Sequence, residues 1–334
     1  MMKTPLKTIP ESLLQILAYA SLSPSGHNTQ PWKVKILSSD ELIIQSDPAR
    51  WLHETDPANR VTFLSLSAFF ETFSQASSSI GFETQFELLA NTAKDIDVFH
   101  IKLLPSTSLP RYNLGIIKSR GTIRSNYSTR PLEPLHIDLI TKLSPDSIIY
   151  FPRRSEKGKW IAENLLEAIR QQIFDDKKQT ELSYWLRFSR KEAEERGDGL
   201  TAETLEIGGF EKFFWHTFFS RKTALSNFFR NRAVNMANEQ LNNCSGFVVI
   251  SSHNNSLPSL FQTGRLYQRF GLKVTELGIA HHAMSQLMEE NPWSTQLQHQ
   301  IKLPAIVQFV IRVGYSTVTH GPSIRRPLSS FVET

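Results

Sequence analysis

The sequence predicts a layered fold of the α+β or α/β class, and three observations on its 334 residues support this. Segments with the alternating or continuous apolar pattern of strands occur at 33–37, 42–45, 82–89, 96–104, 247–251 and 306–313. Helical spacing of apolar residues occurs at 13–18, 57–80, 160–174 and 266–280. Hydrophobic residues make up 40% and charged residues 21%, so the chain can bury a sizeable core. Strands interleaved with long helices therefore imply sheets covered by helices.

Charge and composition limit the partners that we expect. The formal net charge is +5, and the Lys and Arg residues are scattered among acidic residues rather than gathered in a stripe. We therefore expect no nucleic acid partner, and a local anionic ligand such as a phosphate fits the surplus better. No apolar run approaches the roughly 20 residues of a membrane span. The sequence has a single cysteine, Cys244, and no apolar leader, so we expect a cytoplasmic protein without a membrane partner.

The most informative segment is a helix-to-strand loop with small polar side chains, Ser23-Pro24-Ser25-Gly26-His27-Asn28-Thr29-Gln30-Pro31-Trp32. Free backbone N–H groups, hydroxyls and an amide at close range suit a planar polar ligand. From the residues alone, a plain loop rich in turn formers is the favoured alternative.

This loop resembles the Ser-Pro-Ser-x-x-Asn-x-Gln-Pro-Trp signature of the nitroreductase family at every fixed position. In that family the loop comes from the partner subunit of a homodimer and packs against the ring and ribityl chain of flavin mononucleotide (FMN). The resemblance implies FMN as cofactor, NADH or NADPH as hydride donor, and an α+β nitroreductase-like fold. It assigns flavin contacts to Pro24, Ser25, Gly26, His27, Asn28 and Gln30.

A second motif, Arg120-Gly121-Thr122-Ile123-Arg124, combines two guanidinium groups and a hydroxyl. Such a set can bind phosphate or face negative charge on a reduced ring, although a solvated basic turn is the simpler explanation. It resembles the family's Arg-x-Ser-x-Arg/Lys segment. The resemblance assigns Arg120, Gly121 and Thr122 to the phosphate side and Arg124 to the flavin ring.

Two further segments resemble family contacts. Arg325 and Arg326 stand where the family supplies its last phosphate contacts, and we expect Arg120 and Arg326 to face an open cleft. The passage from Leu277 to Gln286 resembles the one beside flavin N5. The usual Pro, Glu and Gly of that passage are Ala283, Ser285 and Gln286 here, so the contacts of Ser285 and Gln286 depart from the pattern.

The order of the motifs predicts a duplication, although no exact repeat is visible. Each half of the chain holds the motif that the other lacks, as in the duplicated, single-chain, Acg-like branch of the family. We expect two tandem halves that form a pseudo-dimer with one flavin site. Residues 1–104 would carry the flavin-ring loop, and 105–334 the phosphate motifs with a lid-like insertion at about 182–229. The chain would be a monomer or a loose homodimer.

Other chemistries have little support in the sequence. His281 and His282 are adjacent and would diverge on a helix, so we expect helix-end histidines and no metal site. Gly197-Asp198-Gly199 lacks the third glycine of a dinucleotide fingerprint. No nucleophile constellation is present, so no side chain is assigned as catalytic and the chemistry would reside at flavin N5.

Two functions remain in balance. The first is an FMN oxidoreductase that passes hydride from NAD(P)H to a nitroaromatic or quinone-like small-molecule acceptor. The alternative is an FMN storage or redox-sensing protein with little turnover, because the aromatic-rich segment 182–229 could close over the flavin. A flavin-dependent dehydrogenase of a biosynthetic intermediate is a weaker third possibility.

Overall fold

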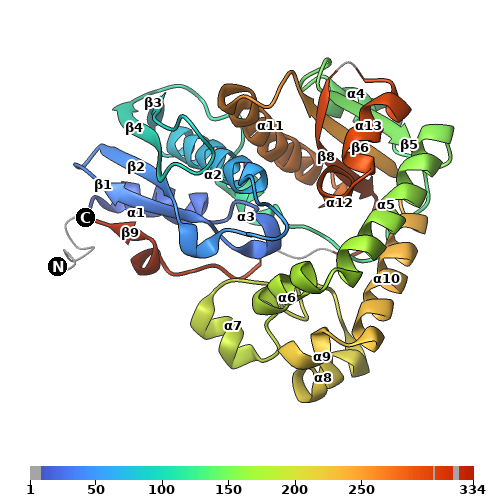
Figure 1. Cartoon of the computed structure of the whole chain (residues 1–334). Helices are drawn as coiled ribbons and strands as arrows, with labels where there is room; N and C mark the ends of the chain where they lie inside the picture. The colour runs from blue at the N-terminus through green and yellow to red at the C-terminus, as the bar shows by residue number, and fades with distance from the viewer. Residues whose placement is uncertain (1–8, 304, 319–322) are drawn as a thin grey trace.

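Two sheets form the two halves of this α+β protein (Figure 1). The structure is a computed structural model that describes residues 9–303, 305–318 and 323–334. The first sheet has the order β3-β4-β2-β1-β9, with β1 (Trp32–Ile36), β2 (Glu41–Ser46), β3 (Phe82–Leu88), β4 (Asp97–Pro105) and β9 (Val332–Glu333). The second has the order β5-β6-β8-β7, with β5 (Ile148–Pro152), β6 (Gly246–Ser252), β7 (Ala280–Ala283) and β8 (Ile306–Gly314).

The two sheets repeat one topology. Counted from β1 and from β5, the orders are β1-β2-β4-β3 and β5-β6-β8-β7, with every neighbouring pair antiparallel. Helix α1 (Glu11–Ala20) precedes β1 as α4 (Pro134–Thr141) precedes β5. Helices α2 (Arg60–Ser79) and α11 (Leu257–Glu276) take equivalent places between the second and third strands. This match confirms two tandem halves within one α+β chain.

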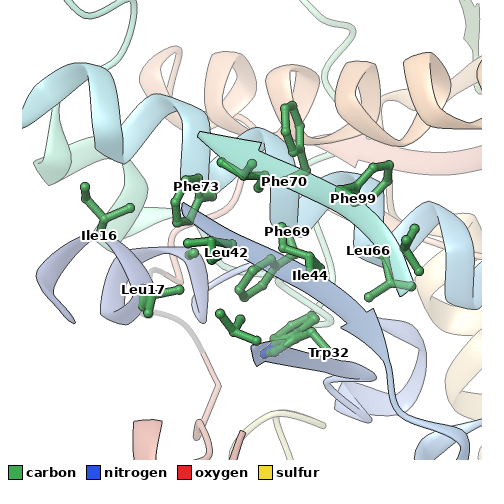
Figure 2. Close-up of a cluster of buried hydrophobic side chains, with 14 of the residues drawn as sticks. Ile16, Leu17, Trp32, Leu42, Ile44, Leu66, Phe69, Phe70, Phe73 and Phe99 are labelled. Atoms are coloured by element: carbon green, nitrogen blue, oxygen red, sulfur yellow. The ribbon is translucent and has the colours of Figure 1, made fainter. Parts of the chain in front are cut away.

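Helices α2 and α11 pack against each other and join the halves. A Cβ added at Gly264 would lie 2.5 Å from the Cβ of Ser67 and 2.6 Å from the carbonyl oxygen of Leu64, so only glycine permits this approach. The core of the first half extends through this contact, because the ring of Phe261 lies 5.1 Å from Phe70 and 4.8 Å from Phe99. Figure 2 shows the same core around Trp32 and Phe69.

A helical insertion distinguishes the second half from the first. A short turn joins β1 to β2, whereas residues 153–245 join β5 to β6. This segment forms α5 (Glu156–Phe174), α6 (Asp176–Trp185), α7 (Arg190–Arg196), α8 (Gly209–Phe218), α9 (Arg221–Ala224) and α10 (Asn227–Asn242). Helices α5 and α10 run side by side and carry α6 to α9 at the bottom of Figure 1. The segment 182–229 lies in this lobe.

The remaining elements are short. They are α3 (Leu114–Ser119), α12 (Gln286–Glu289), α13 (Trp293–Ile301) and the 3-10 turns η2 (Gly26–Asn28), η3 (Pro48–Arg50) and η4 (Leu328–Ser330). Strand β9 pairs in parallel with β1, and Phe331 and Val332 are buried in the core of the first half. The end of the chain therefore returns to the first sheet, although the boundary that we expect at residues 104 and 105 assigns it to the second half.

Two predicted helices have different bounds. The helix predicted at 266–280 begins earlier and ends at Glu276, and His281 and His282 lie on β7, so the expectation of helix-end histidines is wrong. Gly278, with φ 67°, lies between the helix and this strand. The helix predicted from residue 57 begins at Arg60, because Asn59 adopts a left-handed conformation and the Asp56 carboxylate instead accepts from Thr62 N at 2.8 Å.

Candidate functional site

One cavity of about 640 Å³ lies where the two halves and the insertion meet. Its walls come from the loop before β1, from helices α2 and α11, from the chain at 122–124 and 282–289, from β8 and from the insertion. Of the residues predicted to bind flavin, the structure brings eight to this cavity: Pro24, Ser25, Gly26, His27, Thr122, Arg124, Ser285 and Gln286. Two motifs about a hundred residues apart in the sequence thus line one space.

The loop that opens this cavity has an unusual backbone. His27, Asn28 and Gln30 have φ values of 47°, 55° and 52°, in the left-handed region that side chains other than glycine disfavour. Such a conformation persists only where neighbouring structure enforces it, and it is concentrated at functional sites. The loop is therefore held in a fixed shape against the cavity.

Asn28 and Gln30 supply that enforcement and do not line the cavity. Asn28 Nδ2 donates to the carbonyl oxygens of Gly199 and Ile324, both at 3.1 Å. Gln30 Nε2 donates to the carbonyl oxygen of Gly197 at 2.7 Å. The structure thus places these two side chains as clamps between the loop and the insertion.

The glycines of the segment 197–199 have a role that the sequence pattern did not indicate. Gly197 has φ 62°, and a Cβ there would lie 2.6 Å from the carbonyl oxygen of Arg325. Gly199 has φ 75°, and a Cβ there would lie 2.4 Å from the carbonyl oxygen of Trp185. Both positions require glycine because the backbones approach so closely, which the comparison with a dinucleotide fingerprint could not reveal.

Arg325 and Arg326 are buried and engaged with the backbone. Arg325 donates to the carbonyl oxygens of Ser21, Leu22 and Ser23, at the end of α1. Arg326 Nη2 donates to the carbonyl oxygens of Gln30 and Trp32, at 2.7 Å each. Neither guanidinium lines this cavity, so their contacts with a flavin phosphate stay a prediction. Arg326 is only 5% exposed, and it lines a different cleft, which is described below.

Arg120 is a buried cation with two N–H donors that are unused in the described part of the chain. It is 3% exposed, and its Nη2 donates to the carbonyl oxygen of Leu22 at 3.0 Å. Its Nε and Nη1 have no hydrogen-bond partner among the described residues. Burial, and to a smaller extent repulsion by Arg120, lowers the pKa of Arg325 to about 9. Neither Arg120 nor the buried Gly121 lines the cavity. The Arg120 side chain packs at Gly271, which lies one helical turn beyond the wall residue Tyr267.

The walls of the cavity are mostly apolar, with a few polar groups. Of these, the sequence did not assign Arg60, His282 and Glu289 to the flavin. Burial lowers the pKa of His27 to about 4 and that of His282 well below its usual value. His282 Nδ1 and Gln286 Oε1 have no partner among the described residues. Burial raises the pKa of Glu289, opposite Arg60. Arg124 is also buried, and its Nη1 donates to the carbonyl oxygen of Thr204 at 2.7 Å. The cavity thus offers neutral imidazoles and buried cations to a ligand.

The insertion covers one side of the cavity. The segment 182–229 contributes the apolar wall residues Leu182, Leu186, Leu200, Leu205, Ile207, Phe214, Trp215, Phe219, Phe228 and Phe229. Other aromatic residues of the same lobe point outward, since Phe210 is 75% and Phe218 61% exposed. The lobe therefore forms a wall of the cavity and also presents an apolar outer face.

Sequence comparison places this chain beside two curated relatives. The Mycobacterium tuberculosis protein acg, named as an NAD(P)H nitroreductase, is 24% identical over 320 residues, covering 92% of this chain and 91% of that protein. PigM of Serratia, also named as an NAD(P)H nitroreductase, is 23% identical over 340 residues, covering 98% of this chain and 94% of that protein. No protein-family model matches the sequence.

Among solved structures, the FMN-dependent nitroreductase NfnB of Mycobacterium smegmatis, in complex with NADPH, is 13% identical with a TM-score of 0.39. The match covers 64% of this chain and 94% of that one. A nitroreductase of Desulfitobacterium hafniense with bound FMN is 12% identical with a TM-score of 0.36, over 64% of this chain and 93% of that one. The two curated relatives carry the comparison, because they match over nearly the full length. None of the described helices combines the length and the apolar character needed to cross a membrane.

Proposed function

We propose, since this chain belongs to the nitroreductase family, that it is an FMN-dependent NAD(P)H oxidoreductase with a nitroaromatic or quinone-like acceptor. One observation carries the proposal: Pro24–His27 of the Ser-Pro-Ser loop and Thr122 and Arg124 of the Arg motif line a single cavity between the tandem halves. The mostly apolar walls favour a flat, weakly polar acceptor.

The residues present fit FMN by two observations. Arg120 has two buried N–H donors without a partner among the described residues, as a buried cation that awaits an anion would. The cavity volume of about 640 Å³ lies within the range of cofactor sites. Two residues of its wall, His282 and Gln286, each have a buried polar atom without a partner among the described residues. Arg120 would hold the phosphate, and the Pro24–His27 loop with Arg124 would hold the ring.

When bound, FMN supplies a ring that accepts hydride and returns electrons to an acceptor. Arg124, a buried cation in the wall, would stabilise negative charge on the reduced ring. His27 and His282 remain neutral at physiological pH, because burial keeps both pKa values low, so they can orient a ligand without adding charge. The aromatic residues of the lobe would exclude water from the same space.

An FMN storage or redox-sensing role is the second candidate. It is supported by the wall that Phe214, Trp215 and Phe228 form over the cavity, because such a wall would slow the entry of a nicotinamide. Steady NADH or NADPH oxidation with an added quinone would favour the reductase. A flavin that dithionite reduces and nicotinamides do not would favour storage.

The first test is the cofactor itself. We expect FMN, identified by visible spectrum and mass of the released chromophore, at no more than one per chain. Arg120→Met should lower FMN affinity by about one to two decades, since a charge-assisted contact contributes roughly 1.5–3 kcal/mol. The apoprotein should unfold at the same or a higher urea concentration, because the substitution removes an unpaired buried charge near Arg325. A colourless protein that does not bind added FMN would refute the proposal.

A further inference from the structure

A second cleft, distinct from the flavin cavity, lies between the first half and the insertion. Its volume is about 900 Å³, and it is formed by the chain at 47–54, helix α6 and residues around 187–198. Three aromatic residues, Trp51, Tyr184 and Trp185, are among its walls. None of the residues lining it lines the flavin cavity. The cleft is therefore a separate candidate for ligand binding.

Most of the acidic groups of this cleft already have partners. Asp198 accepts from Arg187 Nη2 at 2.5 Å and from Arg50 Nη1 at 2.8 Å. The carboxylate of Glu181 accepts from the backbone N–H groups of Glu54 and Thr55, at 3.0 Å each. Asp47 and Asp176 are likewise paired, with Arg50 and Arg230 respectively. The Glu181 carboxylate is hydrogen-bonded but not neutralised, and Glu54 has no ion pair among the described residues.

Six cationic side chains line the cleft, one more than its five carboxylates, and three of the six share one carboxylate oxygen. One carboxylate oxygen, Glu192 Oε1, lies 3.8 Å from Arg187, 3.7 Å from Arg196 and 3.5 Å from Arg221. Arg326 also lines the cleft, and no carboxylate lies within 4.0 Å of it among the described residues. Its buried Nε has no hydrogen-bond partner in that same part of the chain. Positive charge is therefore in local excess around Arg196, Arg221 and Arg326.

An exposed aromatic ring, that of Tyr184, lies beside one of these arginines. Tyr184 is 55% exposed, and the guanidinium carbon of Arg221 lies 5.1 Å from its ring centroid. An exposed aromatic face beside arginine donors can stack a planar base while the guanidinium groups bind its phosphates. We propose that this cleft binds a nucleotide, with Arg196, Arg221 and Arg326 toward the phosphates and Tyr184 toward the base.

The test uses FMN-saturated protein, so that the flavin cavity is filled, and titrates ADP, adenosine and pyrophosphate by calorimetry at low salt. We expect ADP to bind at least tenfold more tightly than either fragment and more weakly as salt rises. Arg196→Ala and Arg221→Ala should each weaken ADP binding by roughly 3- to 10-fold, because these contacts are partly exposed. Arg190→Ala is the matched control, an exposed arginine on the same helix as Arg196 that does not line the cleft.

Each other outcome overturns the proposal. Absent ADP binding, or equal ADP affinity in the Arg196, Arg221 and Arg190 variants, would remove the site. Pyrophosphate binding as tight as ADP would show an anion site without base recognition. Displacement of FMN by ADP, seen as a change in the flavin spectrum, would place ADP in the other cavity. Unchanged urea midpoints in the variants exclude loss of fold as the cause.

Discussion

Substitution of Asn28 tests whether this residue contacts the flavin or holds the loop in place as a structural clamp. The family resemblance assigns it to the flavin, whereas the structure engages its amide with the backbone. Asn28→Ala would remove two hydrogen bonds from Nδ2, to Gly199 and Ile324, and one that Oδ1 accepts from Arg325 Nη1 at 3.1 Å. A clamp should contribute to the stability of the protein even without flavin.

The expected magnitude follows from these three contacts. A neutral hydrogen bond contributes about 0.5–1.5 kcal/mol, and one from a charged donor about 1.5–3 kcal/mol. The Ile324 carbonyl oxygen also accepts from Arg325 Nη1 at 3.0 Å, so the substitution leaves it partly satisfied. We therefore expect Asn28→Ala to lower the free energy of unfolding of the apoprotein by about 2–4 kcal/mol.

The assay is urea unfolding of the flavin-free protein. With a urea dependence of about 3 kcal/mol per molar, the midpoint should fall by about 1 M. Asn231→Ala, at an exposed position of α10, is the control and should leave the midpoint nearly unchanged. If Asn28→Ala leaves apoprotein stability unchanged but weakens FMN binding, Asn28 is not a structural clamp, and the result supports the flavin contact that the family resemblance assigns to it.

Three further predictions concern the core and the titrating groups. Gly264→Val should lower the free energy of unfolding by about 3 kcal/mol, because its side chain would overlap α2; an unchanged urea midpoint would show that the helices can separate freely. Burial lowers the pKa of His27 from 6.5 in the unfolded chain to about 4 in the folded protein. The buried neutral imidazole therefore contributes stability that is fully present above pH 6.5 and is lost as the pH falls toward 4, because the unfolded chain then binds the proton more readily. His27→Asn, which tolerates a left-handed backbone, should make this loss shallower in urea unfolding; an identical slope would refute the buried imidazole. Burial raises the pKa of Cys244 to about 11, so a thiol reagent should label the protein only after unfolding, and rapid native labelling would contradict its position.

The sequence predicted the elements and the two motifs better than it predicted the roles of individual side chains. Apolar periodicity placed strands near β1, β6 and β8, because burial dominates those segments. It extended the helix through Ala280, since an apolar stretch after a helix does not reveal a turn followed by a short strand. Gly278, with its positive φ, was the signal that could have ended that helix at the right place.

The candidate site was predictable where residues are consecutive and not where they meet only in space. Ser25, Thr122 and Arg124 line the cavity as expected from local motifs. The partners of Asn28 and Gln30 lie more than a hundred and sixty residues away, and nothing in either segment alone shows their pairing. Arg60 and Glu289 likewise reach the cavity only because α2 and the chain after β7 converge there.

The pairing of β9 with β1 has a consequence for synthesis on the ribosome. Strand β1 is synthesised long before Val332–Glu333, the neighbour that covers its outer edge, so this edge stays open until β9 has been translated. An open strand edge is a template for pairing with another chain. The first sheet is therefore complete only once β9 has been made, and a nascent chain that lacks β9 presents an edge at which two chains can pair.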